Sequence, residues 1–388
     1  MMTGSQKFLK KHVLDEGLCT GCGACVGICP YQVIYHDRTV QLHGCDLVKG
    51  RCYDYCPRTP CDVGAIRERY CAAGDLTPEI GAVKGYYFSR AADPGLRNIG
   101  QHGATVTAML ELALSEGLID AAVVSSRDQL SLRKGVIVQN REAIRTHAGS
   151  QFTVSATVAA FHQLVTKHTG QVGIVATPCQ ALALAKMKFN PGHEDIARVN
   201  QLTLVIGLYC GWTLSEEKYL KLLTDKGIAL ESITEMDIPA GRNVLEIRTE
   251  DRLHSIAMEE AQTCIREACL YCMDSTAEFA DVSVGSARFS GNWEDVRQWN
   301  QLIVRTTKGK ELTDLAVEKG VLELREAPAD SLKELKEAAV NKKKNALKNI
   351  IQKSGSAKNL LYLDSRDPAV LKYLEAEKKK RKKVKSEW

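Results

Sequence analysis

The amino-acid sequence predicts an α+β module at the N-terminus, an α/β body after it, and a helical extension at the C-terminus. Three observations support this division. Nine of the 14 cysteines fall between Cys19 and Cys71, strand-like and helical segments alternate from about Ala82, and a charged helical pattern begins at Pro328. We therefore expect three parts, which are residues 1–78, 79–327 and 328–388.

Composition and charge exclude several classes of protein. With 44% hydrophobic and 26% charged residues, the chain resembles a globular protein and not a disordered or fibrous one. Residues 378–388 carry seven basic side chains and one acidic one, so the rest of the chain is close to neutral and predicts no nucleic-acid partner. No stretch reaches the roughly 18 apolar residues of a membrane span, and residues 1–12 lack the apolar segment of a secretory signal. We expect a cytoplasmic protein with no membrane span.

The N-terminal module carries the signature of an iron–sulfur site. Residues 19–30 read CTGCGACVGICP, which is the C-x2-C-x2-C-x3-C-P run of bacterial ferredoxins. Zinc is the alternative, but zinc sites usually pair two separate Cys-x-x-Cys motifs. We therefore expect Cys19, Cys22 and Cys25 to bind one [4Fe–4S] cluster, while Cys29, which precedes proline, ligates a neighbouring cluster.

A second, less regular copy of this run follows, made of Cys45, Cys52 and Cys56. By the pseudo-symmetry of two-cluster ferredoxins, Cys56 completes the first cluster, and Cys29 joins Cys45 and Cys52 in the second. The usual position of the second cluster's fourth ligand holds no cysteine. We expect Cys61 to take this role, with Cys71 as the next candidate. The alternatives are a three-iron cluster and a second site that never fills.

The body alternates strands and helices. Apolar residues at helical spacing predict helices over 101–116, 150–167 and 180–187, and short apolar runs predict strands over 119–125, 172–176 and 202–208. Strands that alternate with helices indicate a largely parallel sheet.

Two cysteines come just after predicted strands of the body. Cys179 follows the strand over 172–176, and Cys210 follows the strand over 202–208. The carboxyl ends of such strands form the edge where open α/β sheets bind ligands. Cys264, Cys269 and Cys272 lie further along the chain, so a Cys-x-x-Cys pair and two strand-end cysteines supply the four thiolates that a [4Fe–4S] cluster needs. Zinc, a redox-active dithiol and plain burial of small apolar side chains remain open on spacing alone.

The usual nucleotide-binding motifs are missing. The sequence has no G-x-G-x-x-G after a strand, no G-x-x-x-x-G-K-[ST] and no H-E-x-x-H. Gly103, Gly149 and Gly285 mark places where the backbone could approach a phosphate or a flavin closely.

From about Gly100 to about Asn349 the sequence resembles the beta subunits of coenzyme F420-reducing hydrogenases and F420-dependent formate dehydrogenases. The resemblance rests on the segments QHGATVTAMLELALSEGLIDAAVV, AGSQFTVSATV, GIVATPCQALALAKM, LVIGLYCGW, MDIPAGRN, CLYCMDSTAEFADVSVGS and NQLIVRTTKGKEL. Many members of that family also carry an N-terminal two-cluster ferredoxin module, which the cysteine pattern of this chain resembles. The spacing of Cys45 and Cys52 departs from the family's pattern.

The resemblance implies an FAD held by loops and a further [4Fe–4S] cluster in the body. The implied cluster ligands are Cys179, Cys210, Cys269 and Cys272, which leaves Cys264 as a spare or substitute. The implied flavin-binding residues are Gln101, His102, Gly103, Ala104 and Thr105, then Ala148, Gly149, Ser150 and Gln151, then Gly285 and Ser286.

The resemblance also implies a function. A hydride carrier exchanges two electrons at once and a cluster exchanges one, and a flavin can join the two without a catalytic acid or base. With one FAD and three [4Fe–4S] clusters, we expect an oxidoreductase subunit that moves electrons between a hydride carrier and a partner enzyme. The carrier is coenzyme F420 by resemblance, or a nicotinamide, and the partner is a formate dehydrogenase, a hydrogenase or a heterodisulfide reductase-like complex. The alternatives are a stand-alone, ferredoxin-dependent reductase of an organic double bond or hydroxymethyl group, and an electron relay that binds no carrier.

The lysine-rich end after Leu374 has two interpretations. It is either a solvated, disordered tail, because like charges repel each other and bury nothing, or an arm that docks on an acidic partner subunit. We expect its removal to leave iron, flavin and carrier oxidation intact.

Overall fold

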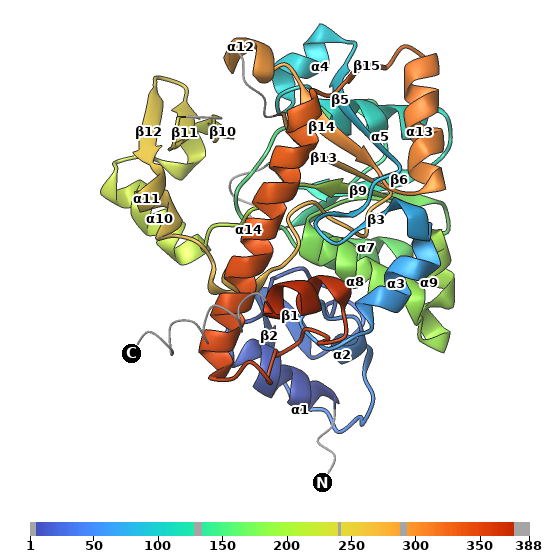
Figure 1. Cartoon of the computed structure of the whole chain (residues 1–388). Helices are drawn as coiled ribbons and strands as arrows, with labels where there is room; N and C mark the ends of the chain where they lie inside the picture. Colours follow the sequence, from blue (N-terminus) through green and yellow to red (C-terminus); the bar gives the residue numbers. More distant parts are fainter. Residues whose placement is uncertain (1–4, 128–133, 240–241, 288–292, 376–388) are drawn as a thin grey trace.

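The computed structural model describes residues 5–127, 134–239, 242–287 and 293–375, and its centre is a mixed sheet of eight strands (Figure 1). From one edge to the other these are β15 (Leu322–Glu326), β5 (Gly85–Ala91), β14 (Asn300–Val304), β13 (Val282–Ser286), β9 (Leu202–Leu208), β8 (Val172–Ala176), β6 (Ala121–Ser125) and β7 (Gly135–Val138). The predicted strands over 172–176 and 202–208 coincide with β8 and β9, and both predictions are confirmed.

Only the four central strands β13, β9, β8 and β6 run parallel. The strands outside them pair antiparallel, so the expectation of a largely parallel sheet is wrong at both edges. The reason at one edge lies in the connection, because parallel pairing needs a long crossover and only residues 126–134 separate β6 from β7.

Two helices start later than the sequence predicts. The helix expected from residue 150 is α7 (Thr157–Val165), because the residues before it are extended and Thr153 forms a β-bridge with Leu214. The helix expected from residue 101 is α5 (Thr105–Ser115), because His102 and Ala104 both have φ of +55°, which a helix cannot contain. The residues before each helix therefore have an irregular backbone, which can form part of a ligand-binding site.

Helices cover both faces of the sheet and bury its side chains. One face is covered by α5, α13 (Thr307–Glu318), α4 (Pro94–Ile99) and α6 (Arg141–Thr146), whose apolar residues share a core with the strands. The other is covered by α7, α8 (Pro178–Phe189), α9 (Ile196–Gln201) and α14 (Ala329–Ser354). Burial of these apolar faces is the main force that holds the layers together.

The N-terminal module lies below the sheet in Figure 1. It contains α1 (Ser5–Leu9), a π-helical turn over Lys10–Leu14, the hairpin of β1 (Gln32–Tyr35) and β2 (Arg38–Gln41), α2 (Arg51–Asp54) and α3 (Val63–Tyr70). A second small hairpin of β3 (Leu76–Thr77) and β4 (Gly81–Ala82) leads into the body, so the boundary expected after residue 78 falls inside this hairpin.

A separate lobe stands beside the main sheet, at the left of Figure 1. It is an antiparallel sheet of β10 (Ile233–Asp237), β11 (Val244–Thr249) and β12 (Leu253–Ala257), packed against α10 (Glu216–Asp225) and α11 (Met258–Gln262). Its core includes Tyr219, Leu223, Leu245 and Ile247.

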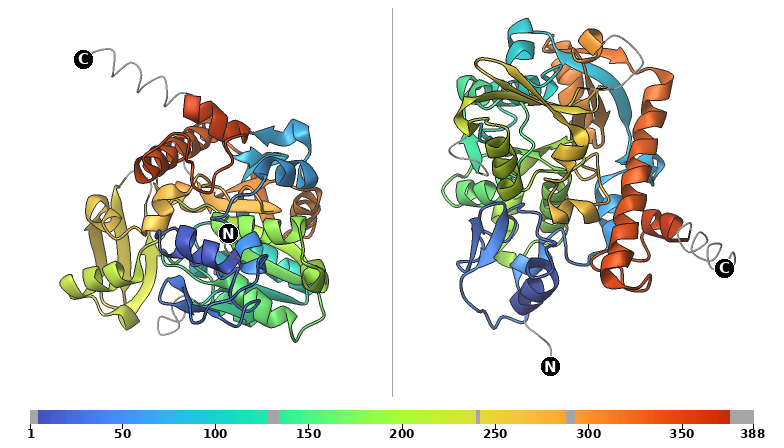
Figure 2. Two further views of the ribbon diagram at one scale, coloured as in Figure 1. Left: turned by 90° about the horizontal axis from the view of Figure 1, so that it is seen from below. Right: turned by 90° about the vertical axis from the view of Figure 1, so that its left-hand side faces the viewer.

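The C-terminal helix α14 runs from the sheet to the N-terminal module (Figures 1 and 2). Ala339 packs on Ile303 of β14, while Leu347 and Ile350 share a core with Leu9 of α1. Residues 368–375 are helical and join the same core. The lysine-rich tail from residue 376 lies outside the described residues, and among those described no helix has the length and apolar character to cross a membrane.

Candidate cofactor sites

The structure brings four thiols of the N-terminal module together around the glycine-rich loop of residues 19–29. Burial raises the pKa of Cys22, and Cys56 and Cys19 raise it further. Burial also raises the pKa of Cys25, and Cys19, Cys22 and Cys56 raise it further. Main-chain N–H groups donate to two of these sulfurs, from Thr39 to Cys19 at 3.3 Å and from Arg58 to Cys56 at 3.4 Å. We call Cys19, Cys22, Cys25 and Cys56 the first thiol group.

Glycine lets this loop pack directly against α7. Gly23 has φ of +83°, and a Cβ atom there would lie 2.8 Å from the main-chain nitrogen and the Cβ of Ala159. A Cβ atom on Gly21, which has φ of +67°, would lie 2.3 Å from the carbonyl oxygen of Asp37. The loop can therefore reach the body only with glycine at these positions.

The second thiol group consists of Cys29, Cys45 and Cys52. Burial raises the pKa of Cys52 to about 12, and Cys29 and Cys45 add to the rise. The choice of Cys61 or Cys71 as the fourth ligand of this group stays a prediction. Burial raises the pKa of both Cys61 and Cys71. The charged groups that further shift the pKa of Cys61 are Lys186, Asp62, Asp364 and Arg67, and those that shift the pKa of Cys71 are Arg305, Asp75, Asp281 and Arg67.

The body thiol group consists of Cys179, Cys210, Cys269 and Cys272, as the resemblance implies. Cys179 lies in the first turn of α8, directly after β8, and Cys210 follows β9. Cys269 and Cys272 lie in and after the 3-10 turn Glu267–Tyr271. Burial raises the pKa of Cys210 against the opposing effect of Lys342, and the other three thiols of the group raise it further.

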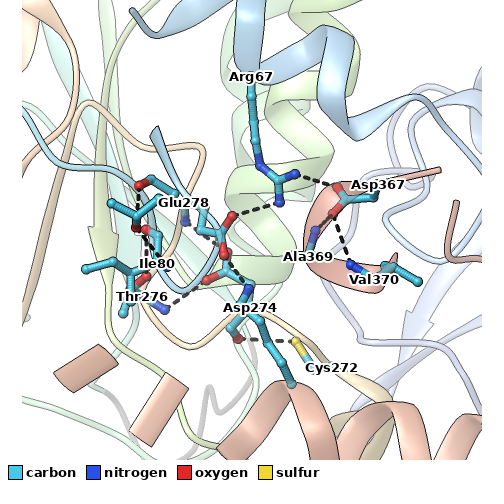
Figure 3. A network of polar contacts seen from close by, with 12 residues as sticks. Arg67, Ile80, Cys272, Asp274, Thr276, Glu278, Asp367, Ala369 and Val370 are labelled. Carbon is cyan, nitrogen blue, oxygen red and sulfur yellow. Dashed lines mark hydrogen bonds and ion pairs between the residues drawn. The ribbon is translucent and has the colours of Figure 1, made fainter. Parts of the chain in front are cut away.

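Hydrogen bonds orient the thiols of the body group. Thr213 approaches Cys269 Sγ with both its main-chain nitrogen and its hydroxyl, at 3.4 Å each. Cys272 Sγ donates to the carbonyl oxygen of Asp274 at 3.4 Å (Figure 3), and the Thr177 hydroxyl lies 3.3 Å from Cys179 Sγ. Because a capping box of Thr177 and Gln180 begins α8, the position of Cys179 is set by the helix start itself.

Two cations, the buried Arg58 and the half-buried Lys342, face the body group. Burial raises the pKa of Cys272, but Lys342 of α14 and Arg58 of the N-terminal module outweigh it, so the pKa lies below its ordinary value. Lys342 also donates to the carbonyl oxygen of Cys210 at 2.6 Å. Four thiolates carry several negative charges in a buried space, and these cations offset part of that charge.

The first and the body thiol groups adjoin each other. After burial, Cys179 of the body is the strongest influence on the pKa of Cys22. Arg58 also connects the two groups. Its main-chain N–H donates a hydrogen bond to Cys56 Sγ, and its guanidinium interacts electrostatically with Cys272 and Cys179. The guanidinium is held by the carbonyl oxygen of Ala268 at 3.0 Å and by the Tyr362 hydroxyl.

Within each thiol group, the sulfur atoms lie near one another but do not surround the position of a single metal ion. Among the described residues, no three His, Cys, Asp or Glu side chains lie as one metal ion would require. Ligands of a single zinc lie about 2.3 Å from it, whereas the thiolates of a cluster bind separate irons and stand further apart. The donor sets therefore fit clusters better than single ions.

A cluster of hydrogen-bonded polar side chains lies at the carboxyl edge of the same sheet. Gln101 donates to Asp237 of β10 at 2.7 Å, and His102 Nε2 lies 3.2 Å from the same oxygen and 3.3 Å from the Ser286 hydroxyl. Burial raises the pKa of Asp237, but His102 outweighs this effect and lowers it. Asn300 of β14 accepts a hydrogen bond from the Thr105 N–H at 3.1 Å.

Buried polar atoms without partners line the loop before α7. Both side-chain polar atoms of Gln151, and the hydroxyls of Thr153, Ser155 and Thr157, are buried and have no hydrogen-bond partner among the described residues. Gly149 has φ of +105°, and a Cβ atom there would meet nothing closer than 3.6 Å. Unsatisfied polar groups are costly to bury, so the side chains of this loop have the chemistry to bind a polar ligand.

Of the implied flavin residues, the structure brings Gln101, His102 and Ser286 into one hydrogen-bonded cluster. Ala148 lies nearby, because Arg127 donates both to its carbonyl oxygen at 2.9 Å and to that of Thr234 in β10. The carbonyl oxygen of Gly285 accepts a hydrogen bond from Asn300 at 3.3 Å. Gly285 also leaves room for Tyr209, since a Cβ atom there would lie 2.0 Å from the tyrosine ring.

Sequence reasoning missed several neighbours of these sites. They are Arg58, Arg127, Asp237, Asn300 and Lys342. Asp237 and Asn300 lie in the recognised segments MDIPAGRN and NQLIVRTTKGKEL, so those segments contained the signal. Cys264, the spare cysteine, lies in the core of the lobe and donates to the carbonyl oxygen of Lys218 at 3.5 Å.

Three family models match this chain. Residues 86–162 match the N-terminal part, and residues 169–330 the C-terminal part, of the coenzyme F420 hydrogenase/dehydrogenase beta subunit. Residues 12–35 match a 4Fe-4S binding domain. The first two matches together span more than half of the 388 residues.

The chain is also similar to curated proteins of methanogens. It is 28% identical over 279 residues to the coenzyme F420 hydrogenase subunit beta of Methanothermobacter thermautotrophicus, covering 70% of this chain and 95% of that one. It is 24% identical over 246 residues to the F420-dependent formate dehydrogenase 1 subunit beta of Methanococcus maripaludis, covering 58% of this chain and 57% of that one. It is 27% identical over 329 residues to the coenzyme F420-dependent sulfite reductase of Methanocaldococcus jannaschii, covering 81% of this chain but only 47% of that protein, so the chain spans about half its length.

A solved structure supports the fold. A chain of the F420-reducing [NiFe] hydrogenase complex from Methanosarcina barkeri superposes with a TM-score of 0.64 at 22% sequence identity, covering 71% of this chain and 94% of that chain. The mixed α/β architecture around the central sheet is thus shared.

Proposed function

Because the chain belongs to the family of coenzyme F420 hydrogenase/dehydrogenase beta subunits, whose members are parts of oxidoreductases, we propose that it is an iron–sulfur flavoprotein that exchanges a hydride between coenzyme F420 and FAD. Its clusters pass single electrons to or from a partner oxidoreductase in the cytoplasm. The partner is a formate dehydrogenase, a hydrogenase or a heterodisulfide reductase-like complex.

One observation carries the proposal. Cys179 and Cys210 each follow a strand of the central sheet, and the carboxyl ends of these strands lie at the edge where His102 meets Ser286. Cys179 also adjoins Cys22 of the N-terminal module. A flavin pocket, a body cluster and a ferredoxin-like cluster would therefore follow one another in space. That order suits a protein that joins a two-electron carrier to one-electron partners.

The residues before α7 and those around His102 are the ones that would hold FAD. Gln151 offers an amide whose two polar atoms are buried and have no hydrogen-bond partner among the described residues, and Gly149, two residues before it, has a φ of +105°. His102 is fixed by Asp237 and Ser286, so its ring presents a defined polar surface. When bound, FAD supplies hydride exchange on one side and single-electron exchange on the other.

The body and first thiol groups would each hold a [4Fe–4S] cluster, and the second thiol group a further cluster. The chain's own task is to neutralise charge and exclude water around these ligands. Buried Arg58 and half-buried Lys342 lie beside the body group and act on the pKa of Cys272 from two different parts of the chain. Lys186 lies at the first group and donates to the carbonyl oxygen of Cys56 at 2.6 Å.

The decisive experiment measures cofactors and hydride transfer together. Anaerobically purified protein should contain about one FAD and about four irons in each of the first and body groups. Stopped-flow mixing with reduced F420, NADH and NADPH should show rapid flavin reduction by reduced F420. A zinc-rich, flavin-free sample would overturn the proposal. Flavin that none of the carriers reduces would instead identify a relay without a carrier site, and reduction of an organic substrate without a partner would identify a stand-alone reductase.

Cysteine variants separate the body group from the rest. Cys269→Ala and Cys179→Ala should each remove about four irons and interrupt electron flow from flavin to the N-terminal module, while reduced F420 still reduces the flavin. Cys264→Ala is the matched control, because this thiol is buried in the core of the lobe and away from the group. Iron loss in the control but not in the two variants would contradict the assignment.

A further inference from the structure

A buried tyrosine of the C-terminal extension contacts both the body thiol group's turn and the N-terminal module. Tyr362 is 8% exposed, and its hydroxyl donates to the carbonyl oxygen of Tyr271 at 2.6 Å. Tyr271 lies in the turn between Cys269 and Cys272. The same hydroxyl accepts a hydrogen bond from the guanidinium of Arg58, whose central carbon lies 4.6 Å from the centre of the tyrosine ring. One side chain beyond residue 330, where the match to the family models ends, thus joins these two parts.

The two hydrogen bonds of Tyr362 are those of a neutral phenol. Burial raises the pKa of its hydroxyl, Cys272 and Cys179 add to the rise, and the opposing effect of Arg58 does not outweigh them. The hydroxyl therefore keeps its proton, which gives it one hydrogen to donate and lone pairs that accept. The carbonyl oxygen of Tyr271 takes the hydrogen, and Arg58 donates to a lone pair. A phenylalanine at this position would make neither contact.

The backbone around Tyr362 is fixed by the fold of the extension. Leu361, directly before it, has φ of +56°, a conformation that residues other than glycine adopt only where their surroundings hold them in it. After Tyr362, Asp367 accepts a hydrogen bond from the Ala369 N–H at 2.8 Å and pairs with Arg67 of α3 (Figure 3). The Tyr362 ring itself belongs to a buried core that includes residues of α1 and α14. The hydroxyl is therefore presented to Arg58 from a fixed position.

The hydroxyl of Tyr362 decides where the charge of Arg58 lies. Arg58 is 5% exposed, and its Nη2 donates to the carbonyl oxygen of Ala268 at 3.0 Å. Its Nη1 donates to the Tyr362 hydroxyl, and its other acceptor, the carbonyl oxygen of Tyr271, lies at the long distance of 3.5 Å. Without the hydroxyl, Nη1 would keep only this weak contact, because hydrogen bonds weaken at such distances. The guanidinium would then no longer be held towards the body group.

We propose that Tyr362 is a positioning residue for electron transfer, whose hydroxyl holds the Arg58 guanidinium beside the body cluster so that this charge favours the cluster's reduced state. The proposal deepens the proposed function and rests on it for the presence of the cluster. The electron enters and leaves the body group without any bond of the chain forming or breaking, and Tyr362 keeps its proton throughout. Its contribution is electrostatic, because a fixed positive charge stabilises the negative charge that reduction adds.

Redox titration of the full chain, purified anaerobically and followed by electron paramagnetic resonance, tests the proposal. The signal of the body cluster is the one that Cys269→Ala lacks. In Tyr362→Phe, at the wild-type midpoint potential, the ratio of reduced to oxidised body cluster should fall by about 3- to 10-fold, which matches the loss of one hydrogen bond. Arg58→Met should lower this ratio further. Tyr362→Phe should then change nothing more in the Arg58→Met background, because the hydroxyl acts through the guanidinium.

A second tyrosine of the same core supplies the matched control. Tyr373 is 4% exposed, and its hydroxyl has no hydrogen-bond partner in the part of the chain that the structure describes. Tyr373→Phe should therefore leave the ratio as in the wild type. An unchanged ratio in Tyr362→Phe, or an equal fall in Tyr373→Phe, would overturn the proposal. An equal further fall in the Arg58→Met background would also overturn it, because Tyr362 would then act on the fold and not through Arg58.

Iron content and flavin reduction by reduced F420, measured on the same samples, separate this inference from the proposed function. Both should be the same in wild type and in Tyr362→Phe, because no thiol and no residue of the flavin cluster is changed. A wild-type protein without clusters would overturn the proposed function and this inference together. Intact clusters and flavin reduction with an unchanged ratio in Tyr362→Phe would overturn this inference alone.

Discussion

Lys343 of α14 donates a hydrogen bond of 2.6 Å to Glu278, and both side chains are only 3% exposed. Arg67 of α3 contacts the other oxygen of the same carboxylate at 2.9 Å and also pairs with Asp367 (Figure 3). One buried carboxylate therefore joins the N-terminal module, the body and the C-terminal extension. Burial raises the pKa of Glu278, but Lys343 and Arg67 outweigh it and lower the pKa to about 2.

Glu278→Gln should destabilise the protein strongly. It leaves the buried Lys343 without its carboxylate partner and removes one of the two carboxylates that pair with Arg67. Breaking a buried ion pair in this way typically costs about 3–5 kcal/mol. The urea midpoint of unfolding at pH 7 measures the effect. Asp314→Asn is the control, because its pair with Lys310 on α13 is exposed at 62% and 57% and should contribute less than about 1 kcal/mol. Equal shifts in the two variants would show that the buried network does not hold the parts together.

Acid should weaken the contact between the N-terminal module and α7 through His162. This side chain is fully buried, its Nε2 lies 3.2 Å from the carbonyl oxygen of Ala24, and burial lowers its pKa from 6.5 to about 4. The unfolded chain binds a proton that the folded chain does not, so the stability from neutral His162 is complete above pH 6.5 and falls as the pH drops towards 4. The loss between pH 7 and pH 5 should be about 2 kcal/mol.

Urea unfolding at pH 7, 6 and 5 checks this prediction. His162→Gln keeps a donor for the Ala24 carbonyl but has no titratable ring, so its stability should depend less on pH. His193→Gln changes a histidine outside the core and should keep the wild-type dependence. Identical pH profiles for all three proteins would refute the role of His162.

Arg58→Met should lower the reduction potentials of the first and body clusters. Reduction adds negative charge, and the positive charge of the Arg58 guanidinium, which acts on Cys56, Cys179 and Cys272, favours that state. Loss of one nearby charge at an effective dielectric constant near 20 corresponds to roughly 50–100 mV. Redox titration followed by electron paramagnetic resonance measures the shift. Arg58→Lys should restore most of the potential, and Arg366→Met, at an arginine whose side chain is 78% exposed, should change nothing.

Gln151→Leu should weaken FAD binding without weakening the apoprotein. The buried amide has no partner in the described residues, so its removal costs the flavin-free fold nothing and relieves an unsatisfied group. If the amide binds FAD, affinity should fall by about 10- to 100-fold, which matches one or two lost hydrogen bonds. Flavin fluorescence titration gives the affinity and urea unfolding the stability. Gln163→Ala, on the exposed side of α7, should alter neither quantity.

Local patterns in the sequence determined much of this protein. The spacing of Cys19, Cys22 and Cys25 and the apolar runs of β8 and β9 are short-range features, because cluster loops and buried strands are specified by a few consecutive residues. The expectation that Cys179, Cys210, Cys269 and Cys272 share one site followed from strand ends and a recognised family pattern. The structure groups these four thiols together.

Other features were decided only by tertiary structure. The late start of α7 depends on the bridge between Thr153 and Leu214, which overrides the helical spacing of the residues before it. The contact of Cys22 with Cys179, the bridge formed by Arg58, and the meeting of Lys343 with Glu278 all join segments that lie far apart in the chain. Such contacts depend on how helices and sheet pack against one another, and no periodicity within one segment encodes them. The spacing of the cysteines identifies candidate cluster ligands, whereas packing decides which thiol groups become neighbours and which charges surround them.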